Sequence, residues 1–102
     1  MRAEPGKLLI GGRWIDAKSG KTFAVYNPTD GTEIAQVAEA GREDVDLAVA
    51  AAGKAFDAGS WSRMPASERA RLLWKLADAI EAQSTTFGLV ETLDNGKPLR
   101  SR

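Results

Sequence analysis

The hydrophobic pattern of this 102-residue chain changes near Gly41, and that change sets the fold class. Before it, short apolar runs are separated by glycine and by turn residues, which is typical of strands joined by tight turns. After it, alanine, leucine and charged residues recur with a helical period. The sequence therefore predicts an α+β chain, with antiparallel strands within residues 7–40 and about three helices within residues 42–96.

The strand-like part contains two turn signals. Gly11-Gly12 lies between two apolar runs and predicts a tight hairpin, because glycine supplies the positive φ angles that such a turn needs. A phosphate-binding loop would require the glycines to open a helix, whereas the strand-like residues 13–15 follow them. A third strand over 22–26 should end at the turn 27–31, and a fourth should run over 33–38.

Start and stop signals outline the helices. Acidic residues in the first turn after Gly41 complement the helix dipole, and Gly59 is a plausible end. A second helix should begin at Pro65, and a third should run from about 85 to 94 with Ser84 as its N-cap. Asn95-Gly96 should end this third helix. The residues expected on the apolar faces are Val45, Ala48, Val49, Ala52 and Phe56 on the first helix, Leu73, Leu76, Ala77 and Ile80 on the second, and Phe87, Val90 and Leu93 on the third.

Composition excludes several classes of function. The 14 basic and 14 acidic residues balance, so we expect neither a nucleic acid nor a membrane as partner. The chain has no cysteine and no histidine, which excludes Cys or Ser-His catalysis and His/Cys metal centres within it. Without a disulfide framework or a signal-peptide pattern at the start, the expected location is cytoplasmic.

Two side-chain clusters have simple structural interpretations. Basic residues beside two tryptophans in the second helical region resemble a nucleic-acid surface, but the neutral total favours a solvated face; they are Arg63, Arg69, Arg71 and Lys75 with Trp61 and Trp74. Glu91 and Asp94 stand three residues apart on a helix and are able to meet one cation, although solvated acids are common at helix ends.

The order of several segments resembles the N-terminal part of NAD(P)-dependent aldehyde dehydrogenases. The segments are Leu8-Leu9-Ile10-Gly11-Gly12-Arg13-Trp14, Tyr26-Asn27-Pro28-Thr29-Asp30-Gly31, Glu43-Asp44-Val45-Asp46, Arg71-Leu72-Leu73 and Glu91-Thr92-Leu93-Asp94-Asn95-Gly96-Lys97-Pro98. The resemblance covers nearly the whole chain. It implies that residues 1–102 form a single partial domain, belonging to the α/β Rossmann-like cofactor-binding domain of the parent family.

The resemblance also implies a function for the parent enzyme. In the family, a cysteine thiolate attacks an aldehyde to give a thiohemiacetal, and oxidation with NAD or NADP yields the carboxylic acid. The residues that do this lie downstream in the family, so no catalytic or cofactor-binding residue is assigned here, and the fragment alone is expected to bind no cofactor and to be inactive. The expected parent is a homodimer or homotetramer. The alternative is a free-standing interaction module that keeps the fold without catalysis.

One site does carry over by resemblance. Aldehyde dehydrogenases often hold a monovalent cation on backbone carbonyls before the Asn-Pro turn and on the aspartate of the Leu-Asp-Asn-Gly-Lys-Pro run. The matching positions in this chain are Val25, Tyr26 and Asp94. Oxygen ligands suit a hard cation, but Asp94 also stands where it can help to end the third helix.

Overall fold

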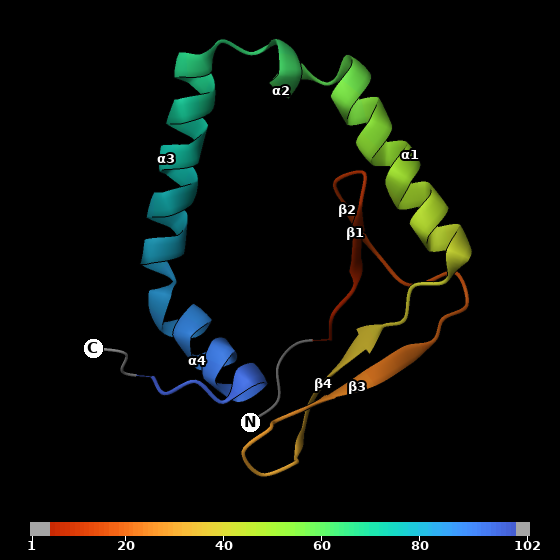
Figure 1. Cartoon of the computed structure of the whole chain (residues 1–102), viewed down its shortest axis with the longest axis vertical. Helices are drawn as coiled ribbons and strands as arrows, with labels where there is room; N and C mark the ends of the chain where they lie inside the picture. Colours follow the sequence, from red (N-terminus) through yellow and green to blue (C-terminus); the bar gives the residue numbers. More distant parts are fainter. Residues whose placement is uncertain (1–4, 100–102) are drawn as a thin grey trace.

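A computed structural model describes residues 5–99 of the chain as strands followed by helices in an open frame (Figure 1). The strands are β1 (Leu8–Ile10), β2 (Arg13–Ile15), β3 (Thr22–Tyr26) and β4 (Glu33–Ala38). The helices are α1 (Arg42–Ala58), α2 (Ser60–Arg63), α3 (Ala66–Ala82) and α4 (Ser84–Asn95). The predicted α+β class is confirmed. The short helix α2 lies in a segment where the sequence indicated only a connector.

The β1–β2 hairpin forms as predicted. The two strands pair antiparallel with Leu9 opposite Trp14 and Leu8 opposite Ile15. Gly11 and Gly12, at φ angles of 60° and 78°, make the turn, and both angles lie in the left-handed region that favours glycine. The turn is therefore a hairpin connection, and the two glycines do not open a helix.

The β3–β4 pair forms the second antiparallel sheet, and the segment before β1 extends it. Val25 pairs with Ala35 and Tyr26 with Glu33, so the register shifts by one residue between these pairs. On the other edge of β4, the Gly6 N–H donates to the Gln36 carbonyl at 2.9 Å. A Cβ at position 6 would lie 2.7 Å from Val37 Cγ1, so this close approach requires glycine. Both edges of β4 are thus occupied.

Helix α1 lies along the β1–β2 hairpin, but not on the face that the sequence indicated. Asp44 is buried, and Ala48 and Ala51 are partly covered. The larger apolar residues Val45, Val49 and Phe56 are exposed, Phe56 by 80%. Of the predicted apolar face, Val45, Val49 and Phe56 are thus uncovered in this structure, and Ala48 is partly covered. The covered stripe carries small side chains, which allow the helix to approach the strands closely.

The second half of the chain consists of α3, α4 and their connections, and two details differ from the prediction. Pro65 precedes α3 as its N-cap, and its carbonyl accepts the N–H groups of Glu68 and Arg69. Gln83, not Ser84, is the N-cap of α4, and its side chain makes no capping hydrogen bond. The predicted end of α4 is confirmed, since Gly96 adopts a left-handed φ of 79° and donates its N–H to the Thr92 carbonyl.

The molecule is far more open than its size requires. Its radius of gyration is 17.2 Å, whereas a compact domain of this length would have about 13 Å. Its accessible surface is 8359 Å², against roughly 5,600 Å² for a compact monomer of this mass. Among residues 5–99 the buried apolar side chains are Ala17, Ile34 and Ala35. All of them precede α1, so the little core that exists lies in the first half.

Candidate functional site

The best-defined polar site in the described part of the chain is the carboxylate of Asp44, which is only 1% exposed. Its Oδ2 accepts the N–H of Gly41 at 2.9 Å, at the start of α1. Its Oδ1 accepts the N–H of Lys18 at 3.0 Å, from the loop between β2 and β3. The two bonds use both carboxylate oxygens and join segments 26 residues apart. Asp44 therefore joins the start of α1 to the loop between β2 and β3.

Sequence reasoning placed Asp44 only among the acids that complement the helix dipole. The second bond, from the Lys18 N–H, depends on the path of the loop between β2 and β3, and no local sequence pattern predicts that path. The available signal was the spacing of Gly41 and Asp44, because an acid three residues after an N-cap can accept the N-cap N–H. The role of Asp44 is therefore a finding of the structure.

The second candidate is an uncovered apolar surface, which we define by seven of the exposed apolar residues of the hairpin, α3 and α4. Its members are Leu9, Trp14, Leu73, Leu76, Ile80, Phe87 and Val90, which are between 44% and 68% exposed. Leu73, Leu76 and Ile80 follow one another at helical spacing, so α3 carries a continuous apolar stripe. The prediction that Phe87 and Val90 point into a core is not met within this chain, because both are exposed.

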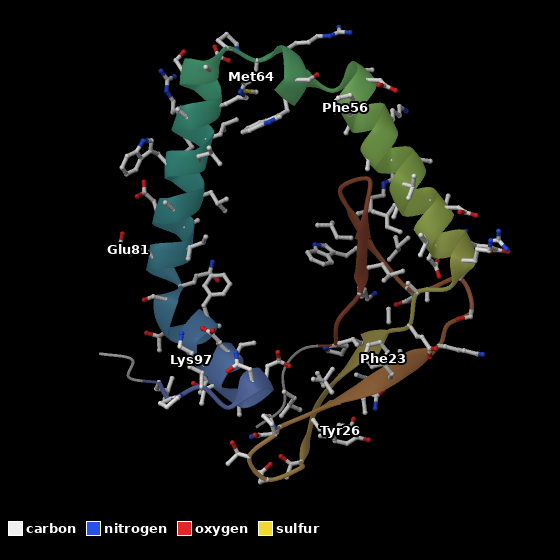
Figure 2. All side chains as sticks on the ribbon, viewed as in Figure 1. Phe23, Tyr26, Phe56, Met64, Glu81 and Lys97 are labelled. Atoms are coloured by element: carbon white, nitrogen blue, oxygen red, sulfur yellow. The ribbon has the colours of Figure 1, made fainter. Side chains whose placement is uncertain are left out.

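The frame leaves this surface without a partner. Side chains of α3 and of the β1–β2 hairpin do not meet across the frame, and Glu81 extends from α3 on the side away from the strands (Figure 2). A shallow hollow on α3 is lined by Ala70, Leu73, Trp74 and Ala77. An exposed apolar stripe of this length marks a contact surface, since monomeric proteins rarely leave one open.

The predicted cation ligands lie at one end of the frame. Val25 and Tyr26 end β3, at the register shift of the sheet, while Asp94 is exposed near the end of α4. The two segments meet through Gly96, because a Cβ there would lie 3.4 Å from Pro28 Cγ in the turn after β3. The fold thus brings the end of α4 against the turn that follows Tyr26. It assigns no coordination to the three residues.

One member of the acidic pair on α4 has a basic partner within the described chain. Glu91 pairs with Lys97 at 3.7 Å, and both side chains are about half exposed. Within residues 5–99 no group of three or more acidic side chains is placed to hold a metal ion. No helix of that range is long and apolar enough to cross a membrane.

The described residues do not fit a dinucleotide. Such a cofactor needs a glycine turn that leads from a strand into a helix N-terminus with free N–H groups. Here Gly11-Gly12 lead into β2, and at the start of α1 the Asp44 carboxylate already accepts the Gly41 N–H. A nicotinamide cofactor would have to be held by residues outside this segment, so no catalytic step is derived through it.

Comparison with known proteins gives one consistent result. The model of the aldehyde dehydrogenase family matches residues 14–102. The mitochondrial aldehyde dehydrogenase of Rattus norvegicus is 55% identical over 93 residues, which are 90% of this chain and 18% of that protein. The NAD-dependent aldehyde dehydrogenase of Sinorhizobium meliloti superposes with a TM-score of 0.91 at 42% identity, over 97% of this chain and 20% of its own.

A further solved structure, the NAD⁺ complex of an aldehyde dehydrogenase from Bacillus cereus, superposes with a TM-score of 0.88 at 46% identity. It is covered over 19% of its length, and this chain over 93%. The chain therefore spans about a fifth of the length of the relatives it matches. Its open frame is closely reproduced within each of the two larger solved structures.

Proposed function

Because this chain belongs to the aldehyde dehydrogenase family, we propose that it is the N-terminal structural segment of an enzyme that oxidises aldehydes to carboxylic acids with NAD⁺. In this proposal residues 1–102 are one partial domain within the cofactor-binding domain of the parent. The observation that carries it is the uncovered apolar surface of a frame that recurs at a TM-score of 0.91 inside a chain about five times longer.

The proposed role of the segment is support, not chemistry. Its described residues include no candidate for the cysteine nucleophile of the family, and the most buried polar group, Asp44, is used in two structural hydrogen bonds. The apolar stripe of α3 is available to pack against the rest of the parent. We therefore expect no aldehyde-dependent reduction of NAD⁺ or NADP⁺ by the chain alone.

A segment exchange tests this proposal. The 93 matched residues of the Rattus norvegicus relative are replaced by those of this chain, and NADH formation from an aldehyde is measured for the chimera, the relative and the chain alone. The chimera should be active and the chain alone inactive. An inactive but folded chimera, or turnover that scales with the amount of purified chain, would contradict the proposal.

The alternative is a free-standing interaction module that keeps the fold without catalysis. The gene sequence beyond Arg102 separates the two proposals. An open reading frame that encodes a cysteine nucleophile supports the enzyme segment, whereas a stop codon directly after Arg102 supports the module. The high identity to relatives about five times longer favours the enzyme segment.

The remaining features of the parent are proposed from its relatives. NAD is the favoured cofactor because one solved neighbour is named NAD-dependent and another is an NAD⁺ complex; NADP use remains the other proposal. We propose a homodimer or homotetramer and a cytoplasmic location. Several relatives are named as mitochondrial, so imaging of the tagged parent in cells tests the cytoplasmic location against a mitochondrial one.

We also propose that Val25 and Tyr26 carbonyls and the Asp94 carboxylate bind a monovalent cation in the parent. Carbonyl and carboxylate oxygens suit Na⁺ or K⁺, and the end of α4 lies against the turn after Tyr26. The test measures the thermal stability of the active chimera in Na⁺ and K⁺ at constant ionic strength. Asp94→Ala should remove the ion dependence and Glu91→Gln should keep it. Equal stability at every ion composition for all three proteins would contradict the site.

A further inference from the structure

The chain has two halves that differ in the contacts that stabilise them. The first half, residues 5–58, contains the buried residues Ala17, Ile34, Ala35 and Asp44. It also contains the bridge from Gly6 to β4. The second half, α3 and α4, contains no buried residue. The broad contacts within the described chain join β1 with β2, β3 with β4, α1 with β1 and α2, and α3 with α4; none joins α3 to the first half.

Local sequence compensates α4 least for the missing contacts, whereas α3 has 17 residues rich in strong helix formers but leaves its apolar stripe exposed. Neither helix has a side-chain hydrogen bond at its N-cap. Helix α4 has only 12 residues and contains Gly88 and several β-branched residues, all of which lower helix propensity. Helices of ~12–15 residues are marginal in water unless an apolar face is packed. This half approaches the first at Gly96, where an added Cβ would lie 3.4 Å from Pro28 Cγ.

We infer that the first half of the chain is folded on its own. Helices α3 and α4 become stably helical only when the rest of a family-length chain packs on the uncovered apolar surface. This inference rests on the proposed function and specifies how the segment would dock. The occupant follows from the comparisons, because about four-fifths of each matched relative lies outside this chain. The first half would then act as the anchor, and α3 with α4 would fold onto the partner.

Two matched glycine substitutions test whether the halves are independent. Gly53 lies in α1 and Gly88 in α4, and an added Cβ meets no atom within 4 Å at Gly53 and only Leu99 Cδ2 at 3.9 Å at Gly88. Each Gly→Ala change therefore favours its own helix without a clash. We expect Gly53→Ala to slow amide exchange about fivefold in the protected first half, whereas Gly88→Ala should have a much smaller effect because α4 is mostly open. Hydrogen exchange resolved by peptide is measured on the 102-residue chain at a concentration low enough to keep it monomeric.

The expected result is protection of β3, β4 and α1 but near-intrinsic exchange in α3 and α4. Gly53→Ala should slow exchange only in the first half, and the small effect of Gly88→Ala should be confined to the second. Equal protection of both halves, an effect of either substitution on both halves, or no protection in the first half would overturn the inference. In the active chimera, α3 and α4 should become as protected as β3 and β4; persistent rapid exchange there would also overturn it. The measurements on the chain alone hold whether or not the chimera is active.

Discussion

Asp44 is the residue on which the first half of the chain most depends. It is an ionisable side chain placed almost completely out of water, and it is tolerated there because both oxygens accept backbone hydrogen bonds. Those bonds set the start of α1 relative to the loop between β2 and β3. The position of the helix against the strands therefore depends on one side chain more than on apolar contact area.

The expected consequence of Asp44→Ala follows from the two N–H groups that lose their acceptor. Both donors are only part-buried, so the free energy of unfolding of the first half should fall by about 1–3 kcal/mol in total. Hydrogen exchange of the β3 and β4 amides measures the change. The exposed Asp46 of the same helix provides the control, since Asp46→Ala should change exchange little. Similar effects of the two substitutions would show that the Asp44 bonds are not important.

Gly59 is required for a different reason, namely the space at the junction of α1 and α2. A Cβ added there would lie 2.2 Å from the Ala55 carbonyl oxygen, so the backbone would have to shift. We expect Gly59→Ala to destabilise this junction by about 1–3 kcal/mol, as overpacking does. Circular dichroism should show a lower thermal midpoint than for the unchanged chain, whereas Gly53→Ala should not lower it. A midpoint unchanged by Gly59→Ala would contradict the steric account.

Among the elements, the β3–β4 hairpin has its own titratable contact in the turn. The carboxylate of Asp30 accepts the backbone N–H of Thr32 at 3.0 Å and its hydroxyl at 2.7 Å. The backbone bond first, and then the hydroxyl bond, lower the pKa of Asp30 below its usual value of 3.8. Because the folded pKa is the lower one, ionised Asp30 stabilises the turn above pH 3.8, and this contribution is lost as the pH falls through the folded pKa.

An NMR titration of the Thr32 amide measures this pKa directly. The midpoint should lie below 3.8, and Asp30→Asn should remove the titration of that signal. A midpoint at or above 3.8 in the unchanged chain would show that the turn does not favour the ionised carboxylate.

Local elements were predictable where the signal is contained in a few adjacent residues. Gly11-Gly12 predicted the hairpin, and Gly96 predicted the end of α4, because positive φ angles strongly favour glycine. The contact face of α1 was not predictable in this way. The periodicity of Val45, Val49 and Phe56 marks an apolar face, but the structure places a neighbouring stripe with small side chains on the strands. Periodicity indicates which residues form an apolar face, but it does not identify the element that packs against that face.

The candidate sites were likewise predictable only where the signal is local. The absence of cysteine and histidine from the sequence already restricted the chemistry that this chain can perform. The Asp44 contact with Lys18 links residues far apart in sequence, so only the fold reveals it. The proximity of the α4 end to the turn after Tyr26 is likewise a property of the fold.

At the scale of the whole molecule, the apolar surface outweighs the core. Three small or medium apolar residues are buried in the described chain, while many larger ones are exposed. Burial of apolar surface is the main favourable term in folding, at about 25 cal/mol per Å². A frame with this little burial gains stability chiefly from whatever covers it, whether that is the rest of a parent chain or other copies of itself.

Sedimentation velocity over a range of concentrations tests this central claim most directly. The isolated chain should associate, with a sedimentation coefficient that rises with concentration, because exposed apolar stripes on α3 and the β1–β2 hairpin find cover in other copies. Replacing Leu73 and Leu76 by serine should reduce the association, since it removes much of the α3 stripe. A compact monomer at every concentration, with the frictional ratio of a globular protein, would contradict the account.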